Sequence, residues 1–303
     1  MRTAVIGLGL IGGSMAIDLR RAGLSSQITG IDQHADHRRL ALELGIADEV
    51  SDSIDAVFGA DLVIMAIPVN AIVSLLPKVL DTAGPGVTVF DAGSTKQQVC
   101  MAVDGHPLRG RFVGAHPIAG TENSGPTAAF AGLFAGKTNI ICERGRSDED
   151  AVTTAMKAFD ALGMRTIFME AEEHDRHVAY VSHLSHVSSF LLGQTVLDIE
   201  KDEKNIFNLA GSGFASTVRL AKSSPEMWAP IFEQNSTYLS QALQEYIMHL
   251  QRFHYLLMKH DTDGLRKIMQ GANDIRRILQ GIELKQSPGG SQGPDQNETN
   301  QKP

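Results

Sequence analysis

A glycine-rich segment near the amino terminus constrains the fold most. It reads Gly7-Leu8-Gly9-Leu10-Ile11-Gly12, the pattern G-x-G-x-x-G, and it follows an apolar run typical of a buried strand and opens an amphipathic helix. In such a unit Gly7 permits a tight turn, Gly9 lets the backbone approach a pyrophosphate, and Gly12 allows close packing of helix on strand. The helix amino terminus, at Leu10 and Ile11, then offers free N–H groups and partial positive charge to phosphates.

An acidic residue follows at the spacing that a dinucleotide site requires. Asp32 lies at the end of the second predicted strand, where a carboxylate accepts hydrogen bonds from ribose hydroxyls and repels a 2′-phosphate. The pattern therefore predicts NAD rather than NADP, although the neighbouring Arg38 and Arg39 weaken that preference. A glycine turn without a ligand is the alternative, and the strand, helix and acidic residue in register argue against it.

Alternating strands and helices over the first half predict an α/β fold. The apolar runs that we interpret as strands are residues 3–7, 28–32, 61–68, 87–91, 112–115, 138–142 and 165–169, and the helices between them include 13–22, 37–44 and 149–162. This order is typical of a Rossmann-type, doubly wound and mostly parallel sheet. We expect a dinucleotide-binding domain over residues 1–171.

The second half shows helical spacing and almost no strand signal. Helices are predicted over residues 172–200, 227–259 and 261–280, with Asp261 capping the last one and Gly281 just past its end. An apolar stripe runs along the second of these helices at Leu239, Leu243, Tyr246, Ile247 and Leu250. We expect an all-helical domain over residues 172–284 for substrate binding and dimerisation. Residues 285–303 lack aliphatic and aromatic side chains, which predicts a disordered tail.

Composition excludes several classes of protein. The formal net charge of -8 disfavours nucleic-acid binding, because an acidic surface repels phosphate backbones. The chain has only two cysteines, which fits a reducing, cytoplasmic setting and excludes a disulfide framework. No stretch is apolar and long enough to predict a membrane span or a signal peptide.

Two polar segments follow predicted strands, where open α/β sheets place their ligands. One holds Ser94 in the sequence D-A-G-S-T-K, and the other begins at His116 in H-P-I-A-G-T-E. A neutral imidazole takes up a proton from a hydroxyl near neutral pH, and a serine hydroxyl orients such a group. His116 is therefore a candidate base, whereas a surface or capping role is the alternative for a histidine taken alone.

The helical half adds further candidates. His183 and His186 are three residues apart and share a helix face, and with His174 and His177 upstream a metal site is conceivable, but no established metal-binding spacing supports it. Arg219 offers the planar cationic fork that binds a carboxylate, or else forms a surface ion pair.

These motifs together resemble the prephenate dehydrogenases and their arogenate-using relatives in tyrosine biosynthesis. The resemblance rests on V-I-G-L-G-L-I-G-G-S, D-A-G-S-T-K, H-P-I-A-G-T-E, S-H-L-S-H and S-T-V-R-L-A-K-S-S-P-E-M-W, in the family's order. It implies that His116 is the catalytic base and that Ser94 hydrogen-bonds the same substrate hydroxyl. It also implies that Arg219 binds a substrate carboxylate and that His186 lines the pocket.

The resemblance also places Thr121 and Glu122 at the pocket mouth and implies a homodimer formed through the helical region. Two positions depart from the family pattern. Ser185 stands where proline is frequent, and Ser216 stands where an acidic residue is frequent, three residues before Arg219. The second departure leaves open whether an ionic network surrounds that arginine.

The expected reaction is oxidative decarboxylation of prephenate to 4-hydroxyphenylpyruvate with NAD as hydride acceptor and without a metal. An arogenate dehydrogenase is the nearest alternative, since Glu122 suits a substrate amino group. A 3-hydroxyacid dehydrogenase and a non-catalytic NAD-sensing module are further alternatives. The H-P-I-A-G-T-E motif argues against the former, and the joint presence of His116, Ser94 and Arg219 argues against the latter.

Overall fold

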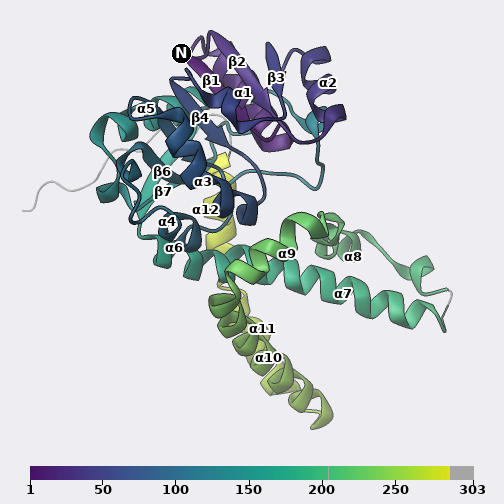
Figure 1. The fold of residues 1–303 in the computed structure, drawn as a ribbon. Helices are drawn as coiled ribbons and strands as arrows, with labels where there is room; N and C mark the ends of the chain where they lie inside the picture. Colours follow the sequence, from purple (N-terminus) through teal and green to yellow (C-terminus); the bar gives the residue numbers. More distant parts are fainter. Residues whose placement is uncertain (204, 287–303) are drawn as a thin grey trace, which may run out of the picture. The chain divides into compact units, whose positions relative to one another are not determined.

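A computed structural model describes residues 1–203 and 205–286, and for residues 282–286 it describes the backbone. The chain forms two compact units, Met1–Tyr246 and a second one that begins at Ile247. Each unit is considered by itself. The first holds the sheet, the helices that cover it and a group of helices beyond it (Figure 1).

An eight-stranded sheet organises the first unit, with the strand order β3-β2-β1-β4-β5-β6-β7-β8. The strands are β1 (Arg2–Ile6), β2 (Gln27–Ile31), β3 (Glu49–Ser51), β4 (Leu62–Met65), β5 (Thr88–Asp91), β6 (Phe112–Pro117), β7 (Thr138–Cys142) and β8 (Arg165–Met169). Strands β1 to β6 are parallel, β7 is antiparallel to β6, and β8 is parallel to β7. The predicted doubly wound, mostly parallel sheet is confirmed. The short strand β3, mostly polar, was not predicted.

Both faces of the sheet are covered along its central strands, which explains the continuous apolar runs in the sequence. In β1, Val5 packs into one core cluster while Ala4 and Ile6 pack into the other, because successive side chains point to opposite faces. One face is covered by α1 (Leu10–Arg21), α2 (Ala35–Glu43) and α5 (Glu149–Ala161), and the other by α3 (Val69–Ala83) and α4 (Gln97–Met101).

The carboxyl ends of the central strands meet at one sheet edge. Because β1, β2, β5 and β6 are parallel, the residues that end them or follow them lie along that edge. They are Gly7, Asp32, Asp91 and His116. The strand order reverses between β1 and β4, the position where open α/β sheets bind ligands.

Past the sheet, one long helical segment carries most of the remaining polar candidates. It consists of α6 (Ala171–Val178), a π-helical turn (Ala179–His183) and α7 (Leu184–Glu200). Then come α8 (Ser212–Thr217), a 3-10 turn (Arg219–Lys222) and α9 (Pro225–Gln234). Figure 1 shows α7, α8 and α9 near one another, and Trp228 and Ile231 of α9 pack with Phe190 of α7.

The predicted single helix over residues 227–259 is wrong. The structure has two helices there, α9 and α10 (Ser236–Met258), with Asn235 between them. Asn235 is buried, and its side-chain amide donates a hydrogen bond of 2.7 Å to the backbone carbonyl of Asp175. The helix therefore breaks where this polar side chain enters the core. In the predicted apolar stripe, Leu239 is buried and Ile247 and Leu250 are exposed.

In the second unit, α11 (Thr262–Ala272) and α12 (Ile275–Gln286) replace the single helix predicted over residues 261–280. The predicted cap is confirmed, since Asp261 accepts a hydrogen bond from the Gly264 N–H at 2.8 Å. Gly281 lies within α12 rather than past its end, because the residues after it favour helix. Lys285 and Gln286 end α12, and the rest of the predicted tail, residues 287–303, lies outside the described residues. Among the helices described, none is long and apolar enough to cross a membrane.

Candidate active site

The glycine-rich turn has the geometry that the sequence predicts. Gly7 has a φ of +97°, and a Cβ added there would lie 2.3 Å from the Ala66 carbonyl oxygen. A Cβ on Gly12 would lie 2.0 Å from the Gly7 carbonyl oxygen. At Gly9, in contrast, the nearest atom to an added Cβ is the Gly125 nitrogen at 4.0 Å. The protein itself therefore leaves space at Gly9, which suits the close approach of a ligand.

The start of α1 suits an anionic group. Gly9 is its N-cap and supplies no side-chain hydrogen bond. The first N–H groups of a helix have no partner within it, so those of Leu10, Ile11 and Gly12 face the turn with the positive end of the helix dipole. These residues fit the pyrophosphate of a dinucleotide.

Asp32 lies beside this turn and is almost buried. Its carboxylate accepts hydrogen bonds from the Leu8 N–H at 3.0 Å and the His34 N–H at 2.9 Å, and it lies 3.1 Å from Nδ1 of His37. Each carboxylate oxygen offers about two lone pairs, so capacity remains for ribose hydroxyls.

The two arginines that weaken the predicted preference for NAD both form hydrogen bonds within the protein. Arg38 donates to the backbone carbonyls of Asp32 and Gln33 at 2.7 and 3.0 Å. Arg39 forms a bidentate pair with Glu43 at 2.7 and 2.9 Å. Neither guanidinium is therefore free of protein partners, which supports the interpretation of Asp32 as the residue that selects against a 2′-phosphate.

The loop after His116 returns to the glycine-rich turn. The Phe130 N–H donates to the Ser14 hydroxyl at 3.0 Å, and the Gly132 N–H donates to the Asp18 carboxylate at 2.9 Å. Both acceptors belong to α1. The segment that begins at the candidate base is thus fastened along the helix that would bind the dinucleotide.

His116, at the carboxyl end of β6, is half-buried. Its Nδ1 lies 2.8 Å from Nε2 of His174, whose Nδ1 lies 2.7 Å from a carboxylate oxygen of Asp175. His174 and Asp175 are buried in α6. Burial, with smaller contributions from His174, Lys96 and His183, holds the pKa of His116 well below its usual value. The imidazole is therefore neutral at neutral pH and able to accept a proton.

Ser94 lies in the loop after β5, the neighbouring strand. A buried ion pair between Asp91 and Lys96 closes this loop, and Asp91 also accepts the Gly93 N–H at 2.9 Å and the Ala115 N–H at 3.0 Å. The last bond ties the Ser94 loop to the residue before His116. The structure thus brings together the two loops that the sequence predicts to hold the base and its serine.

His186 and His183 lie against Trp228. The His186 ring is stacked on the indole with 3.5 Å between ring centroids, and the His183 ring meets it edge-on at 5.8 Å. The predicted shared face of the two histidines is confirmed. Burial lowers the pKa of both, that of His183 to about 4, so neither is a cation at neutral pH.

Arg219 is half-exposed and lies 3.4 Å from the Glu122 carboxylate. Burial lowers the pKa of His186, and the nearby charge of Arg219 adds a smaller effect in the same direction. Arg219 and its partner Glu122 therefore lie close to His186. Ser216 donates to the Gly213 carbonyl at 2.9 Å, within its own helix α8. The hydroxyl of Thr121, an exposed residue, accepts the Asn123 N–H at 3.2 Å within the loop.

The sequence analysis missed four residues that support this site: His174 as a partner of the base, Asp175, Lys96 and Asn235. A signal for two of them was present. The buried residues of α6 are Ala171, His174, Asp175 and Val178, spaced as the inward stripe of a helix. A histidine and an aspartate in such a stripe require buried polar partners.

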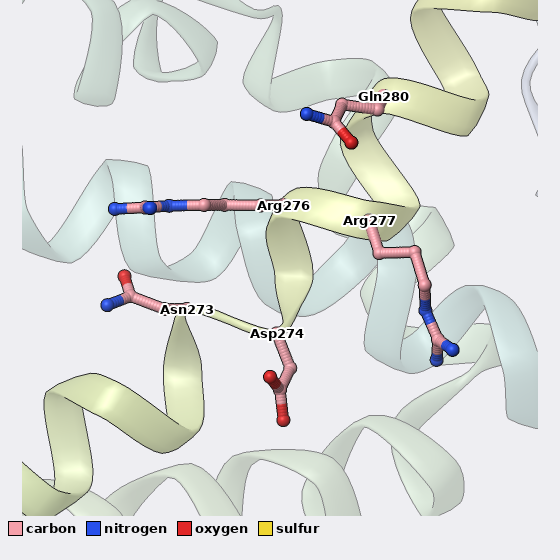
Figure 2. A pocket seen from close by; sticks show the side chains of 5 residues that line it. All are labelled: Asn273, Asp274, Arg276, Arg277 and Gln280. Atoms are coloured by element: carbon pink, nitrogen blue, oxygen red, sulfur yellow. The ribbon is translucent and has the colours of Figure 1, made fainter.

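Two cavities of the structure are not lined by His116, Ser94 or Arg219. One of about 480 Å³ in the second unit is lined by Asn273, Asp274, Arg276, Arg277 and Gln280. Figure 2 shows Arg276 and Arg277 pointing in different directions, so the two cations do not converge on a shared ligand. A second, of about 210 Å³, lies beside α4 and includes Gln97 and Cys100. Among the described residues no group of three metal-ligating side chains is found.

Comparison with known proteins decides the family. A model of the prephenate dehydrogenase nucleotide-binding domain matches residues 15–168, and a model of the prephenate dehydrogenase dimerization domain matches residues 170–271. The chain belongs to the prephenate dehydrogenase family. This confirms the resemblance drawn from its motifs.

Individual members of the family support the same assignment. The cyclohexadienyl dehydrogenase of Zymomonas mobilis is 31% identical over 91% of this chain and 95% of its own. The prephenate dehydrogenase of Bacillus subtilis is 31% identical over 92% of this chain and 76% of its own. A crystal structure of Aquifex aeolicus prephenate dehydrogenase, in complex with hydroxyphenyl propionate and NAD+, has a TM-score of 0.85 and 31% identity over 92% of this chain and 98% of that chain.

Proposed function

We propose that this protein is an NAD-dependent prephenate dehydrogenase, which converts prephenate to 4-hydroxyphenylpyruvate with loss of carbon dioxide. The observation that carries the proposal is His116. It is a neutral, half-buried imidazole at the sheet edge that also carries the glycine-rich turn and Asp32. The relatives support it, since the Aquifex aeolicus enzyme of the same fold was solved with NAD+.

The residues at the sheet edge fit this cofactor. The N–H groups of Leu10, Ile11 and Gly12 would hold its pyrophosphate, and Asp32 its adenosine ribose. When bound, NAD supplies the acceptor for a hydride.

The chain's own residues would handle the substrate. His116 takes the proton of the ring hydroxyl, and Ser94 hydrogen-bonds the same oxygen. Arg219 binds a substrate carboxylate, since a guanidinium forms paired hydrogen bonds with carboxylate oxygens. His186 lines the pocket, with Thr121 and Glu122 at its mouth. The carbon that carries this hydroxyl gives up its hydrogen as a hydride while its carbon–oxygen bond gains carbonyl character. The ring carboxylate leaves as carbon dioxide, and the electron pair of the broken carbon–carbon bond makes the ring aromatic, so that the oxygen ends as the phenol oxygen of the product.

Arogenate is the second candidate substrate, because Glu122 lies close to Arg219. Arogenate carries an amino group where prephenate carries a keto group, and a carboxylate beside the carboxylate-binding arginine suits such an ammonium. Position 216, where an acidic residue is frequent in the family, holds a serine, so this chain lacks a second carboxylate there to bind the ammonium of arogenate. Prephenate therefore remains the first choice.

One assay tests the function and separates the two substrates. NADH formation is measured by absorbance with prephenate and with arogenate in parallel, under matched enzyme and NAD concentrations. We expect a higher kcat/KM with prephenate. A higher value with arogenate would reverse the assignment, and no NADH with either would refute the proposed function. Repeating the assay with NADP tests the cofactor preference.

We further propose the predicted domain division, 1–171 and 172–284, and a homodimer formed through the helical domain. Support for the homodimer comes from the family's dimerization domain and from exposed apolar side chains in this region. They include Leu191, Leu197, Met248, Leu250 and Met258. Sedimentation at micromolar concentration tests the dimer, and a monomer would contradict it. A cytoplasmic location is supported by Cys100 and Cys142, both buried and unpaired.

A further inference from the structure

A line of three polar side chains leads from the surface of the site into the core. Its outer member is His116, and its inner members, His174 and Asp175, have relative exposures of 0% and 2%. The contacts measure 2.8 Å between the imidazoles and 2.7 Å from His174 to the carboxylate. None of the family motifs quoted above contains the inner two residues.

The inner end of this line is fixed by the backbone. The two carboxylate oxygens of Asp175 accept the Lys96 N–H at 2.7 Å and the Gln97 N–H at 2.9 Å. The Asn235 amide also donates to the Asp175 backbone carbonyl. Lys96 and Gln97 directly follow the Ser94 loop, so one carboxylate connects both halves of the candidate site.

Donor and acceptor roles follow outward from that carboxylate. Because it acts as an acceptor, Nδ1 of His174 must carry the hydrogen, and a neutral imidazole then has a bare Nε2. That bare nitrogen accepts from Nδ1–H of His116. Nε2 of His116 is therefore the nitrogen without a hydrogen, and it is the one that does not face His174.

We propose that His174 and Asp175 are positioning residues that hold His116 in the tautomer whose Nε2 accepts the substrate proton. This inference rests on the proposed function and deepens it. The proton leaves the ring hydroxyl for Nε2, and the resulting imidazolium keeps Nδ1–H on His174. The pair thus both selects the tautomer and stabilises the cation that forms.

The charges around His116 make this support necessary. The titratable groups whose charges act on it are His174, Lys96 and His183, and none of the three is an anion. The charge of Lys96 is paired with Asp91, which leaves Asp175, through His174, as the carboxylate aligned with the imidazolium. Without the Asp175 carboxylate, His174 is free to adopt the other tautomer and to donate from its Nε2 to Nδ1 of His116. The hydrogen of His116 then lies on its own Nε2, which can no longer accept the substrate proton.

Substitutions of His174 test the proposal with the full-length protein. His174→Phe removes the acceptor, and we expect kcat to fall on the order of 100-fold or more, while KM for prephenate and NAD stays within about twofold. His174→Gln offers a side-chain oxygen to Nδ1–H and should restore part of kcat. His177→Asn, an exposed histidine one turn along α6, is the matched control and should be unchanged.

The pH profile separates positioning from a general loss of structure. In His174→Phe the imidazolium loses its acceptor, so the acid limb of kcat should move to lower pH. Asp175→Asn should lower kcat by about 100- to 10,000-fold through the wrong tautomer, the effect known for the corresponding substitution in serine proteases. A normal kcat and an unmoved limb in His174→Phe would overturn the proposal.

A spectroscopic measurement reads the tautomer without turnover. Nuclear magnetic resonance spectra are recorded on protein with nitrogen-15-labelled histidine near pH 8, where the imidazoles are neutral. The His116 signals are identified by their loss in His116→Asn. We expect a protonated Nδ1 and a bare Nε2 in the parent and a reversed or mixed state in Asp175→Asn. A protonated Nε2 in the parent would overturn the proposal even if the enzyme is active. Absence of turnover with both substrates would refute the function but leave this result intact.

Discussion

The His186 imidazole lies flat on the Trp228 indole, with an interplanar angle of 26°. Trp228 is the single tryptophan of the chain, so tryptophan fluorescence reports on the surroundings of this one indole, the His186 contact among them. Protonated imidazoles quench indole fluorescence, and the pKa of His186 lies below its usual value because the ring is partly buried. Below about pH 6.5 we expect a loss of fluorescence that follows His186. The step should persist in His177→Asn and vanish in His186→Asn; a step that survives in His186→Asn would point to His183.

Asp32→Ala should weaken NAD binding and relax the preference against NADP. Charge-assisted hydrogen bonds of this kind contribute about 1.5–3 kcal/mol. Binding is measured by titration of each cofactor. Asp36→Ala, a more exposed carboxylate in the same region, is the matched control and should bind NAD normally. Unaltered affinity and selectivity in Asp32→Ala would remove the ribose assignment.

Arg219→Ala should raise KM for prephenate strongly and leave NAD binding intact. Loss of a charge-assisted contact to a substrate anion costs about 2–5 kcal/mol. Arg219→Lys should recover only part, because an ammonium lacks the bidentate fork. Lys222→Ala, in the same 3-10 turn and exposed, serves as the control. If KM stays unchanged in Arg219→Ala, the arginine is a surface ion pair with Glu122 and nothing more.

His116→Asn should lower kcat by about 100- to 10,000-fold, since asparagine keeps hydrogen bonding but takes up no proton. In the parent, kcat should rise with pH through one ionisation, which the lowered pKa of His116 places below about 6.5. That limb should be missing from the residual activity of the variant. Steady-state kinetics across pH checks both statements, with His249→Asn as the control. Near-normal turnover with the same limb would transfer the role of base to another group, first of all His186.

The free energy of unfolding should fall as the pH drops below about 6.5. The pKa values of His116, His174, His183 and His186 are all lowered in the folded protein, chiefly by burial. The unfolded chain therefore binds more protons in this range, so stability is complete above the unfolded pKa and is lost below it. For His183 the loss extends to about pH 4.

Each such histidine contributes at most about 1.4 kcal/mol per pH unit to that slope. Denaturant unfolding at a series of pH values measures it. His183→Asn should flatten the slope, whereas His177→Asn should not. A slope identical in both variants would show that His183 titrates normally in the folded state.

Short-range patterns made much of the site predictable. The glycine spacing, Asp32 and the loops at Ser94 and His116 each follow directly from a strand, and the parallel sheet then gathers them at one edge. Such features need only local sequence and the rule that parallel strands end together.

The inner support of the site was not predictable in the same way. His174 and Asp175 meet His116 and Lys96 across 58 and 79 residues of chain, and no local pattern specifies such a pairing. The breaks at Asn235 and at 273–274 were missed for a related reason. The apolar spacing of the sequence continues across both breaks and therefore predicts unbroken helices. At the first break, α9 and α10 are separated where the Asn235 side chain is buried and donates to a backbone carbonyl.

The π-helical turn between α6 and α7 has an evolutionary consequence. A wide turn of this kind amounts to one inserted residue within a helix, and one residue rotates everything after it by about 100°. The insertion lets a single helix direct His174 toward the sheet and His186 toward Trp228. A descendant that lost one residue between Ala179 and His183 would turn one of these two faces away from its partners. Deletions in this stretch should therefore be selected against even though none of its residues is assigned to the cofactor, and insertions and deletions among relatives should gather in the loops instead.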